Sequence, residues 1–275
     1  MNNRVITPFR YPGGKFYALK YLEPFWLTVL HDEYREPFVG GGSVFFAKPK
    51  AKFNWINDID SDLITTYRAI QDPILSKRLL NRSVEEEASR ERWQEIKKHV
   101  PKNKIDVAFK YYYLNRTSFS GKMISSAWGY RPKRSIPPYR WGEKIIPAST
   151  KLADTKITSL DFENVIAAPS QGERVLIFLD PPYFNPPKRK HYINGFTQPD
   201  HQRLQNILRK TQYKFFLTYE DCKEIREMYE WAHIYPVKFF YRVDNSNVFQ
   251  KKRRVGEELI ITNYKLNYGL FERTI

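Results

Sequence analysis

Four consecutive residues, Asp180-Pro181-Pro182-Tyr183, combine groups that suit the recognition of an aromatic amine. The Asp180 carboxylate and the Pro181 carbonyl can accept the two N–H donors of an exocyclic amino group, while Tyr183 stacks on the ring that carries it. The prolines remove two backbone donors and fix the local backbone, and Pro181 also favours an extended conformation at Asp180. The segment therefore predicts a rigid site for an amino group, with a Pro-rich turn as the plain alternative.

A run of three glycines, Gly40-Gly41-Gly42, is followed by Asp58, 18 residues after Gly40. Glycines between a strand and a helix let the backbone approach a ligand closely, and a following acid can hold ribose hydroxyls. A dinucleotide fingerprint would need a small residue where Phe45 stands, and Gly14-Lys15 is followed by Phe16 instead of the Ser or Thr of a phosphate-binding loop. The pattern favours a nucleoside ligand without phosphates, with a mere tight turn as the alternative.

A third motif, Tyr11-Pro12-Gly13-Gly14-Lys15, places two glycines between an aromatic residue and a lysine. Such a loop could lie close against a ligand, with Tyr11 on a ring and Lys15 near a carboxylate. By itself this motif is ambiguous.

These motifs need a sheet that brings them together, and the sequence predicts one. Residues 34–47 read as a short strand, a glycine turn and the start of a helix, and a second strand at 53–57 ends at Asp58. The stretch 199–210 predicts a helix that connects two later strands. Asp180 then follows a strand at the carboxyl edge of the sheet, where α/β proteins bind ligands. The later strands, predicted to be buried on both faces, are at residues 174–179, 213–218 and 258–262.

Residues 63–151 read as an insertion into this α/β sheet. The pattern is helical over 63–100, whereas 117–150 is rich in Ser, Pro, Gly, Trp and Arg and predicts a loop or hairpin region instead of core. Residues 63–151 contain 19 Lys and Arg against 8 Asp and Glu, a net of +11. We therefore expect one domain formed by residues 1–62 and 152–275, interrupted by a basic second domain.

The composition points to a polyanionic partner. The 275 residues carry a formal net charge of +16, and 16% of them are aromatic. Positive charge that follows phosphates, together with rings that stack on bases, is how single or flipped nucleotides are held. No apolar stretch approaches the ~18 residues of a membrane span, and the N-terminus lacks a signal region. The single cysteine, Cys222, excludes an internal disulfide framework and a Cys-rich zinc site. We expect a cytoplasmic protein.

Taken in chain order, the motifs resemble those of the Dam-like (alpha-class) S-adenosylmethionine-dependent DNA adenine-N6 methyltransferases. The resemblance implies a Rossmann-like methyltransferase sheet with an inserted, largely helical plus hairpin target-recognition domain. It spans nearly the whole chain. The matching segments are residues 11–15, 36–46, 57–64, 113–116 and 180–183, with weaker similarity at 159–162, 195–197 and 253–259.

The resemblance also implies roles by position. Asp180, Pro181, Pro182 and Tyr183 would hold the target adenine, and Asp161-Phe162 would flank the adenine of the cofactor. Residues implied in S-adenosylmethionine binding are Tyr11, Lys15, Phe38, Gly40, Gly42, Asp58, Ile59, Asp161, Phe162 and Asp180.

A further set of residues is expected to contact double-stranded DNA. Most of them are basic and can contact either bases or phosphates. For each basic residue the expectation favours phosphate over a base, because phosphates and sugars receive half or more of protein–DNA hydrogen bonds. Phe119 is a candidate wedge that fills the gap left by a flipped base, with core packing as its alternative. Residues 251–254 read as backbone-binding. The candidate DNA-binding residues are Arg10, Asn115, Arg116, Phe119, Lys122, Arg131, Lys133, Arg134 and Arg140.

The implied mechanism follows from the chemistry of adenine. Its amino lone pair is delocalised into the ring, so two acceptors on the N–H bonds are needed to localise it. Catalysis is then mainly positioning and electrostatics, with no metal and no covalent enzyme intermediate. Because the amino group is buried in duplex DNA, the base must be flipped out at a cost of a few kcal/mol.

Several alternatives stay open at this stage. The acceptor could be cytosine N4 in DNA or adenine in RNA, and a non-catalytic DNA-recognition protein is a different class altogether. Members that methylate GATC carry a Phe/Tyr-Asn-(Val)-Pro-Phe/Tyr-Gly segment that is missing here, so the resemblance does not predict GATC as the target. The default expectation is a monomer, because one subunit can engage one target base. The sequence leaves open whether a cognate restriction endonuclease is a partner.

Overall fold

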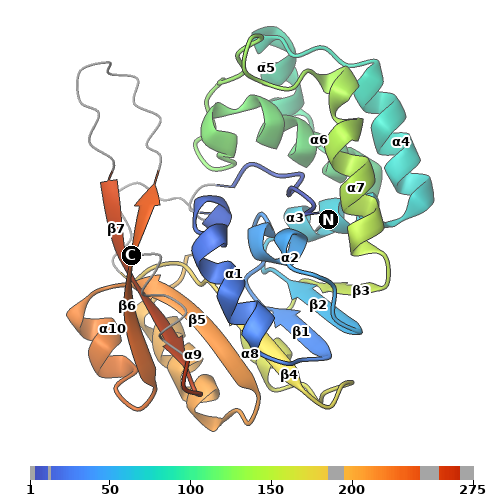
Figure 1. Ribbon diagram of the computed structural model, residues 1–275. Helices are drawn as coiled ribbons and strands as arrows, with labels where there is room; N and C mark the ends of the chain where they lie inside the picture. Colours follow the sequence, from blue (N-terminus) through green and yellow to red (C-terminus); the bar gives the residue numbers. More distant parts are fainter. Residues whose placement is uncertain (1–3, 12–13, 185–194, 242–253, 267–275) are drawn as a thin grey trace.

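Seven strands form one sheet within the residues that the computed structural model describes, which are 4–11, 14–184, 195–241 and 254–266 (Figure 1). The strand order is β3-β2-β1-β4-β5-β7-β6. The first five strands in this order are parallel, and β7 is antiparallel to both β5 and β6. The predicted α/β sheet is therefore confirmed as a mostly parallel sheet with an antiparallel hairpin. The strands are β1 (Glu33–Glu36), β2 (Phe53–Asn57), β3 (Thr155–Thr158), β4 (Val175–Leu179), β5 (Lys214–Glu220), β6 (His233–Tyr241) and β7 (Arg254–Thr262).

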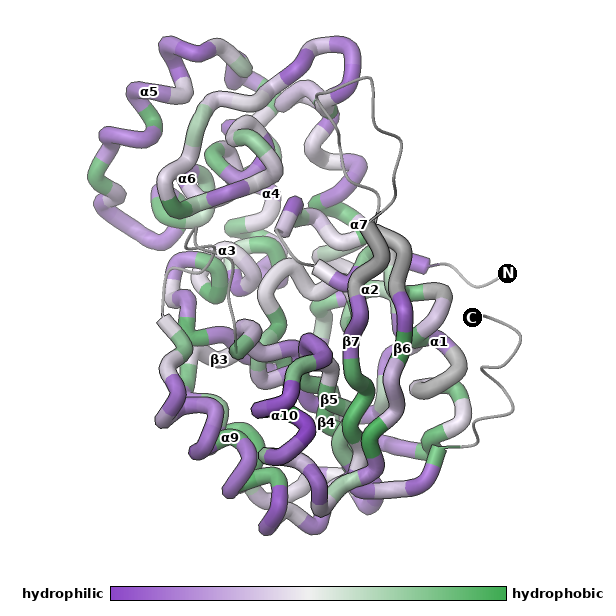
Figure 2. Tube along the Cα trace, turned by 90° about the vertical axis from the view of Figure 1, so that its left-hand side faces the viewer, coloured by the Kyte–Doolittle hydropathy of each residue, from purple (hydrophilic) through white to green (hydrophobic). Residues whose placement is uncertain are grey.

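The side chains of β4 alternate between two hydrophobic cores, one on each face of the sheet. Val175, Ile177 and Leu179 join the core beneath α8, α9 and α10, while Leu176 and Phe178 join the core beneath α1 and α2. Hydrophobic residues follow the central strands, and hydrophilic residues follow the outer turns of α9 and α10 (Figure 2). The helices named are α1 (Leu19–Thr28), α2 (Ser43–Ala47), α8 (Phe162–Ile166), α9 (Gln198–Lys210) and α10 (Lys223–Met228).

The order of the strands places a crevice between β1 and β4. The chain leaves β1 through α2 on one face and reaches β4 through α8 on the other, so the connections diverge at this point. Ligands of open α/β sheets bind at such a switch point, outside the carboxyl ends of the strands. Asp180 directly follows β4, which confirms its predicted position at this edge.

The helical pattern predicted over residues 63–100 is confirmed. Each of the first four helices of this region begins after a residue whose side chain accepts backbone N–H groups of the first turn, which satisfies donors that a helix leaves unpaired. These caps are Asp60, Asp72, Ser89 and Asn103. The helices of this region, which gather at one end of the molecule (Figure 1), are α3 (Ser61–Gln71), α4 (Pro73–Val84), α5 (Arg90–Lys98), α6 (Lys104–Thr117) and α7 (Gly142–Leu152).

The prediction that residues 117–150 lie outside the core is wrong from Trp141 onward. Gly142 and Pro147 are both helix breakers in isolation, yet both lie within α7. Trp141, Ile145 and Ala148 are fully buried and recur at the spacing of one helix face. Burial of that face outweighs the weak local propensity of glycine and proline. The irregular part is confined to residues 118–141, where an antiparallel bridge joins residues 118 and 128 as expected of a hairpin.

The helical region shares its core with the sheet. Tyr67 of α3 packs on Phe46 of α2, with ring centroids 6.2 Å apart, and on Phe9, at 4.8 Å. The Tyr67 hydroxyl also donates a hydrogen bond of 2.8 Å to the carbonyl of Gly40. Residues 63–151 therefore pack against the part of the chain that precedes them and are hydrogen-bonded to it.

Two strands were not predicted, and both lie at edges of the sheet. The β6 sequence is interrupted by Pro236 and Lys238, which suits an edge strand but hides its strand pattern. The β3 segment is four residues long, too short for a clear alternation. Within the described residues, no helix is long and apolar enough to cross a membrane.

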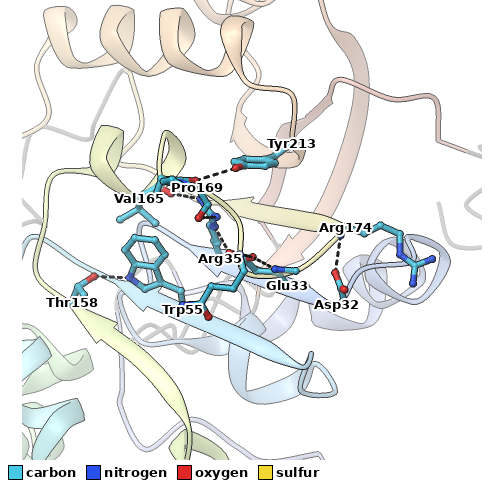
Figure 3. A network of polar contacts seen from close by, with 12 residues as sticks. Asp32, Glu33, Arg35, Trp55, Thr158, Val165, Pro169, Arg174 and Tyr213 are labelled. Atoms are coloured by element: carbon cyan, nitrogen blue, oxygen red, sulfur yellow. Dashed lines mark hydrogen bonds and ion pairs between the residues drawn. The ribbon is translucent and has the colours of Figure 1, made fainter.

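Arg35 lies fully buried in β1, with its side chain between Glu33 and the segment that contains Val165 and Pro169 (Figure 3). Its guanidinium donates to Glu33 Oε1 at 2.7 Å and to the backbone carbonyls of Val165, Ala168 and Pro169 at 2.8, 2.8 and 3.0 Å. Val165 lies in the last turn of α8, where a helix has unpaired acceptors, and Ala168 and Pro169 follow this helix. One side chain thus ties β1 to the segment that leads into β4.

Replacing Arg35 with methionine should lower the free energy of unfolding by about 3–5 kcal/mol, because it leaves the buried Val165 carbonyl and part of the buried Glu33 charge unpaired and removes the hydrogen bonds to Ala168 and Pro169. Urea unfolding of Arg35→Met measures this loss. Arg174→Met is the control, because this substitution removes the same charge from a side chain that is exposed at the start of the neighbouring strand β4. Equal midpoints for the two variants would contradict a structural role for Arg35.

Candidate active site

A cavity opens at the carboxyl ends of β1, β2 and β4, at the switch point of the sheet. Each of the three motifs contributes residues to the cavity wall. In the motif of residues 11–15, residues 12 and 13 lie outside the described residues. The ten residues predicted for cofactor binding all line this one cavity: Tyr11, Lys15, Phe38, Gly40, Gly42, Asp58, Ile59, Asp161, Phe162 and Asp180.

The glycine turn and Asp58 are tied together on one wall. Gly40 and Gly42 have φ angles of +45° and +68°, which glycine adopts without strain. Asp58 follows β2, and its Oδ2 accepts the Gly40 N–H at 2.8 Å, while its Oδ1 accepts the Asp60 N–H at 3.0 Å. Burial raises the pKa of Asp58 to about 6. Each carboxylate oxygen keeps a further acceptor position for a hydroxyl.

The opposite end of the cavity is aromatic. Phe38, Phe162 and Phe196 form a cluster with ring centroids 5.4 to 5.7 Å apart. Arg203 of α9 reaches across this cluster to Asp161, with its Nη2 2.8 Å from Asp161 Oδ1. This end can enclose a flat apolar ring and presents a carboxylate at its margin. Phe196 and Arg203 were not assigned from the sequence, although Phe196 belongs to one of its weaker matching segments.

The third part of the cavity is a buried cluster of charges around Asp180. The Asp180 Oδ1 accepts hydrogen bonds from Lys15 Nζ at 2.6 Å and from Thr218 Oγ1 at 2.9 Å. Lys15 Nζ also donates to the Tyr183 hydroxyl at 3.0 Å. Burial raises the pKa of Asp180 above its ordinary value, and the Lys15 charge opposes this rise. Within the described residues both of these hydrogen bonds go to Oδ1, which leaves Oδ2 to accept from a ligand.

Glu258 completes the charge cluster and had no role in the sequence-based prediction. It lies on β7, is 3% exposed, and its Oε1 accepts a hydrogen bond of 2.7 Å from the Tyr183 hydroxyl. A signal existed, because Glu258 is a carboxylate directly before an apolar strand run and lies in a weakly matching segment. Thr218, inside the apolar run of β5, gave no such signal.

The candidate DNA-binding residues divide into buried and exposed groups. Asn115 is fully buried, and its side chain accepts from the Arg10 N–H at 2.9 Å and donates to the Arg10 carbonyl at 2.7 Å. Arg116 is also buried, and Arg10 itself is half-buried. Phe119 is 50% exposed, so core packing is the wrong alternative for it. Lys122 is half-buried; Arg131, Lys133, Arg134 and Arg140 are exposed.

Two further observations concern this basic group. Arg140 is paired with Glu143, its Nε lying 2.6 Å from Glu143 Oε1. The predicted backbone-binding residues 251–253 lie outside the described residues. Among the described residues, no group of three or more His, Cys, Asp or Glu side chains is arranged to hold a metal ion.

Comparison with known proteins decides among the remaining alternatives. A family model described as D12 class N6 adenine-specific DNA methyltransferase matches residues 11–243. The chain belongs to this family. The protein is thus an adenine-specific DNA methyltransferase (EC 2.1.1.72), and the alternatives of cytosine N4, RNA and a non-catalytic protein are set aside. As a member of this family, the methyltransferase has S-adenosylmethionine as its implied methyl donor.

Individual relatives cover nearly all of the methyltransferase. It is 28% identical to the type II methyltransferase M.CviBI of Paramecium bursaria Chlorella virus NC1A, over 93% of its own length and 98% of the relative. It is 23% identical to the type II methyltransferase M1.LlaDCHI of Lactococcus lactis subsp. cremoris, over 94% and 96%. The DNA N-6-adenine-methyltransferase of Escherichia phage P1 is 28% identical over 80% of this chain and 30% of the relative.

Proposed function

We propose that the cavity binds S-adenosylmethionine and that Asp180-Pro181-Pro182-Tyr183 holds a flipped-out adenine beside it. The observation that carries this proposal is the convergence of all ten predicted cofactor residues on one cavity whose acidic end is Asp180. When bound, S-adenosylmethionine supplies a methyl group activated by a sulfonium centre.

The cavity offers groups that fit each part of this molecule. Asp58 retains acceptor positions for ribose hydroxyls, and Phe38, Phe162 and Phe196 fit an adenine ring with Asp161 beside it. Tyr11 lines the wall of the same cavity. Asp180 lies at the end away from the phenylalanine cluster. A net negative cluster at that end suits a positively charged ligand.

The target amino group meets acceptors at Asp180. Its Oδ2 and the Pro181 carbonyl accept the two N–H bonds, which localises the nitrogen lone pair, and Tyr183 stacks on the base. Pro181 and Pro182 carry no N–H that could compete for these acceptors. A base can reach this half-buried position only when it has left the duplex stack.

Residues 63–151 serve as the target-recognition region in this proposal, with residues 1–62 and 152–275 as the catalytic part. Arg10 precedes Tyr11 at the cavity, and the 119–122 turn lies beside it, because Asn115 Nδ2 donates both to Arg10 and to the Gly121 carbonyl at 3.3 Å. Since Asn115 and Arg116 are buried, they act by positioning Arg10 and this turn instead of touching DNA. The contacts to DNA would come from the half-buried Lys122 and from the exposed residues Phe119, Arg131, Lys133, Arg134 and Arg140.

Double-stranded DNA is the proposed substrate, and the active form is a monomer in the cytoplasm. Two relatives are named type II methyltransferases, which supports a cognate restriction endonuclease as a partner. Size-exclusion chromatography with light scattering, with and without duplex DNA, tests the monomer.

Affinity for S-adenosylmethionine should fall as the pH drops below about 6, by up to about tenfold per pH unit. The reason is that Asp58, whose pKa is raised to about 6, is a charged acceptor for hydroxyls above this pH and takes up a proton below it. In the Asp58→Asn variant we expect this fall in affinity at low pH to vanish. The affinity near pH 7.5 should drop about 10–100-fold.

Calorimetric titrations from about pH 5 to about pH 8 measure both effects. Asp62→Asn is the control, since Asp62 is an exposed acid four residues further on. An Asp58→Asn enzyme with the affinity and pH dependence of Asp62→Asn would remove Asp58 from the cofactor site.

A further inference from the structure

We propose that Glu258 is a positioning residue for methyl transfer. It holds the side chains of Tyr183 and Lys15 in the positions that they need relative to Asp180. This inference rests on the proposed function of Asp180 and Tyr183. It concerns a residue that contacts neither the base nor the methyl donor in that proposal and acts through the two side chains that do.

Glu258 contacts both of these side chains without lining the cavity itself. One carboxylate oxygen, Oε1, accepts from the Tyr183 hydroxyl at 2.7 Å, and the other, Oε2, lies 3.6 Å from Lys15 Nζ. Lys15 in turn donates to Asp180 Oδ1 at 2.6 Å and to the Tyr183 hydroxyl at 3.0 Å. Lys15, Tyr183 and Glu258 thus form a closed ring of polar contacts, and Asp180 is attached to this ring through Lys15.

This ring fixes the Tyr183 side chain. Its hydroxyl donates to Glu258 and accepts from Lys15, so both roles of the hydroxyl are set by charged partners. Hydrogen bonds to charged groups are about twice as strong as neutral ones. These bonds hold the hydroxyl in place and so fix the axis of the Tyr183 ring. Because a phenolic O–H prefers to lie in the ring plane, the bond to Glu258 also favours one orientation of the ring face on which a target base has to stack.

β7 is a rigid support for this contact. Glu258 is paired with Glu220 of β5, and Leu259 beside it is fully buried. The well-packed backbone of β7 therefore fixes the Glu258 carboxylate in contact with Tyr183, which belongs to the loop after β4. Supporting contacts from a regular element hold a site more accurately than the loop alone.

The charge of Glu258 also bears on the protonation of Asp180. Burial raises the pKa of Asp180, Lys15 lowers it, and Glu258 raises it further. The other titratable groups that interact with Asp180 are Glu36, whose pKa is raised to about 8, and Tyr219, whose pKa is raised far above the working range. Removing the Glu258 charge should therefore lower the pKa of Asp180 and extend activity to lower pH.

Glu258→Gln tests the proposal, with Glu257→Gln as the matched control. Glu257 is the neighbouring residue on β7, but its side chain is exposed and lies 3.6 Å from Lys238. We expect Glu258→Gln to reduce kcat about 10–100-fold with little change in KM for either substrate, since positioning affects the reacting geometry. The acid limb of kcat should move to lower pH, whereas Glu257→Gln should match the unmodified enzyme.

A double-mutant cycle with Tyr183→Phe separates positioning from a general loss of stability. If Glu258 acts through the Tyr183 hydroxyl, Glu258→Gln should cost much less kcat in the Tyr183→Phe background. Additive losses, an unmoved acid limb, or a kcat equal to that of Glu257→Gln would each overturn the proposal. Thermal unfolding of each variant confirms that kcat is compared between folded proteins.

Asp180→Asn serves as a separate reference. It should abolish the acid limb itself, because the titrating carboxylate is gone. An Asp180→Asn enzyme with unchanged kcat and limb would refute the proposed function, whereas normal behaviour of Glu258→Gln alone would refute this inference and leave that function standing.

Discussion

An Asp180→Ala enzyme is expected to lose methyl transfer by about 10³-fold or more while it keeps most of its affinity for DNA. In the proposed function the Asp180 carboxylate is the charged acceptor of the target amino group, and loss of one such preorganised group in a buried site typically costs about 10²–10³-fold. Here the loss is larger, because Lys15 also loses its 2.6 Å hydrogen-bond partner inside the buried site. DNA affinity is carried by phosphate contacts elsewhere.

Single-turnover transfer of a labelled methyl group to duplex DNA, together with a fluorescence-anisotropy titration, measures the two quantities on one preparation. Glu173→Ala is the matched control, since Glu173 is an exposed acid at the opposite end of β4. Transfer at the level of this control would show that the amino group is held by something other than Asp180.

The second large effect concerns salt. Affinity for duplex DNA should fall steeply between about 50 and about 200 mM salt, because each neutralised phosphate releases counterions and adds about 0.9 to the slope of log affinity against log salt. Replacing Arg131, Lys133 and Arg134 together with alanine should lower this slope by about 2.7 and weaken binding at about 0.1 M salt by 10²-fold or more. These three side chains are exposed in the irregular region of residues 118–141.

A control with equal charge removal is available. Arg209, Lys210 and Lys214 are exposed where α9 ends and β5 begins, at the amino edge of the sheet and away from the cavity. The corresponding triple alanine variant changes the net charge by the same amount. If both variants lower the slope equally, the methyltransferase binds through its overall charge, and residues 131–134 hold no particular place in the DNA interface.

The sequence predicted the position of a functional side chain best where a polar residue directly follows an apolar strand. Asp58 and Asp180 each stand directly after an apolar run, so their positions at the carboxyl edge followed from local pattern alone. The cofactor residues converge for the same reason, because parallel strands bring their ends to one edge. Local pattern placed the two acids, whereas the rest of the predicted cofactor set followed from the resemblance to the methyltransferase family.

Contacts that depend on the register of distant strands could not be predicted in this way. Glu258 meets Tyr183 across 75 positions, and their contact follows from β7 entering antiparallel beside β5. Asn115 shows the converse. A polar residue on a helix predicts an exposed position, but its amide is used to hold the backbone of Arg10 in the interior. Nothing in the local sequence distinguishes these two uses of an asparagine.

The packing of Tyr67 limits how such an enzyme can change its target. Because Tyr67 lies against Phe46 and Phe9 and holds the Gly40 carbonyl, the helices that follow it are not a module that can be exchanged for those of a relative. A transplanted region would have to rebuild the wall of the cofactor cavity as well. In the proposed arrangement, new recognition sequences are more accessible through the exposed segment of residues 131–134, whose side chains can vary without disturbing the shared core. Evolution and protein engineering would therefore alter specificity at this segment first.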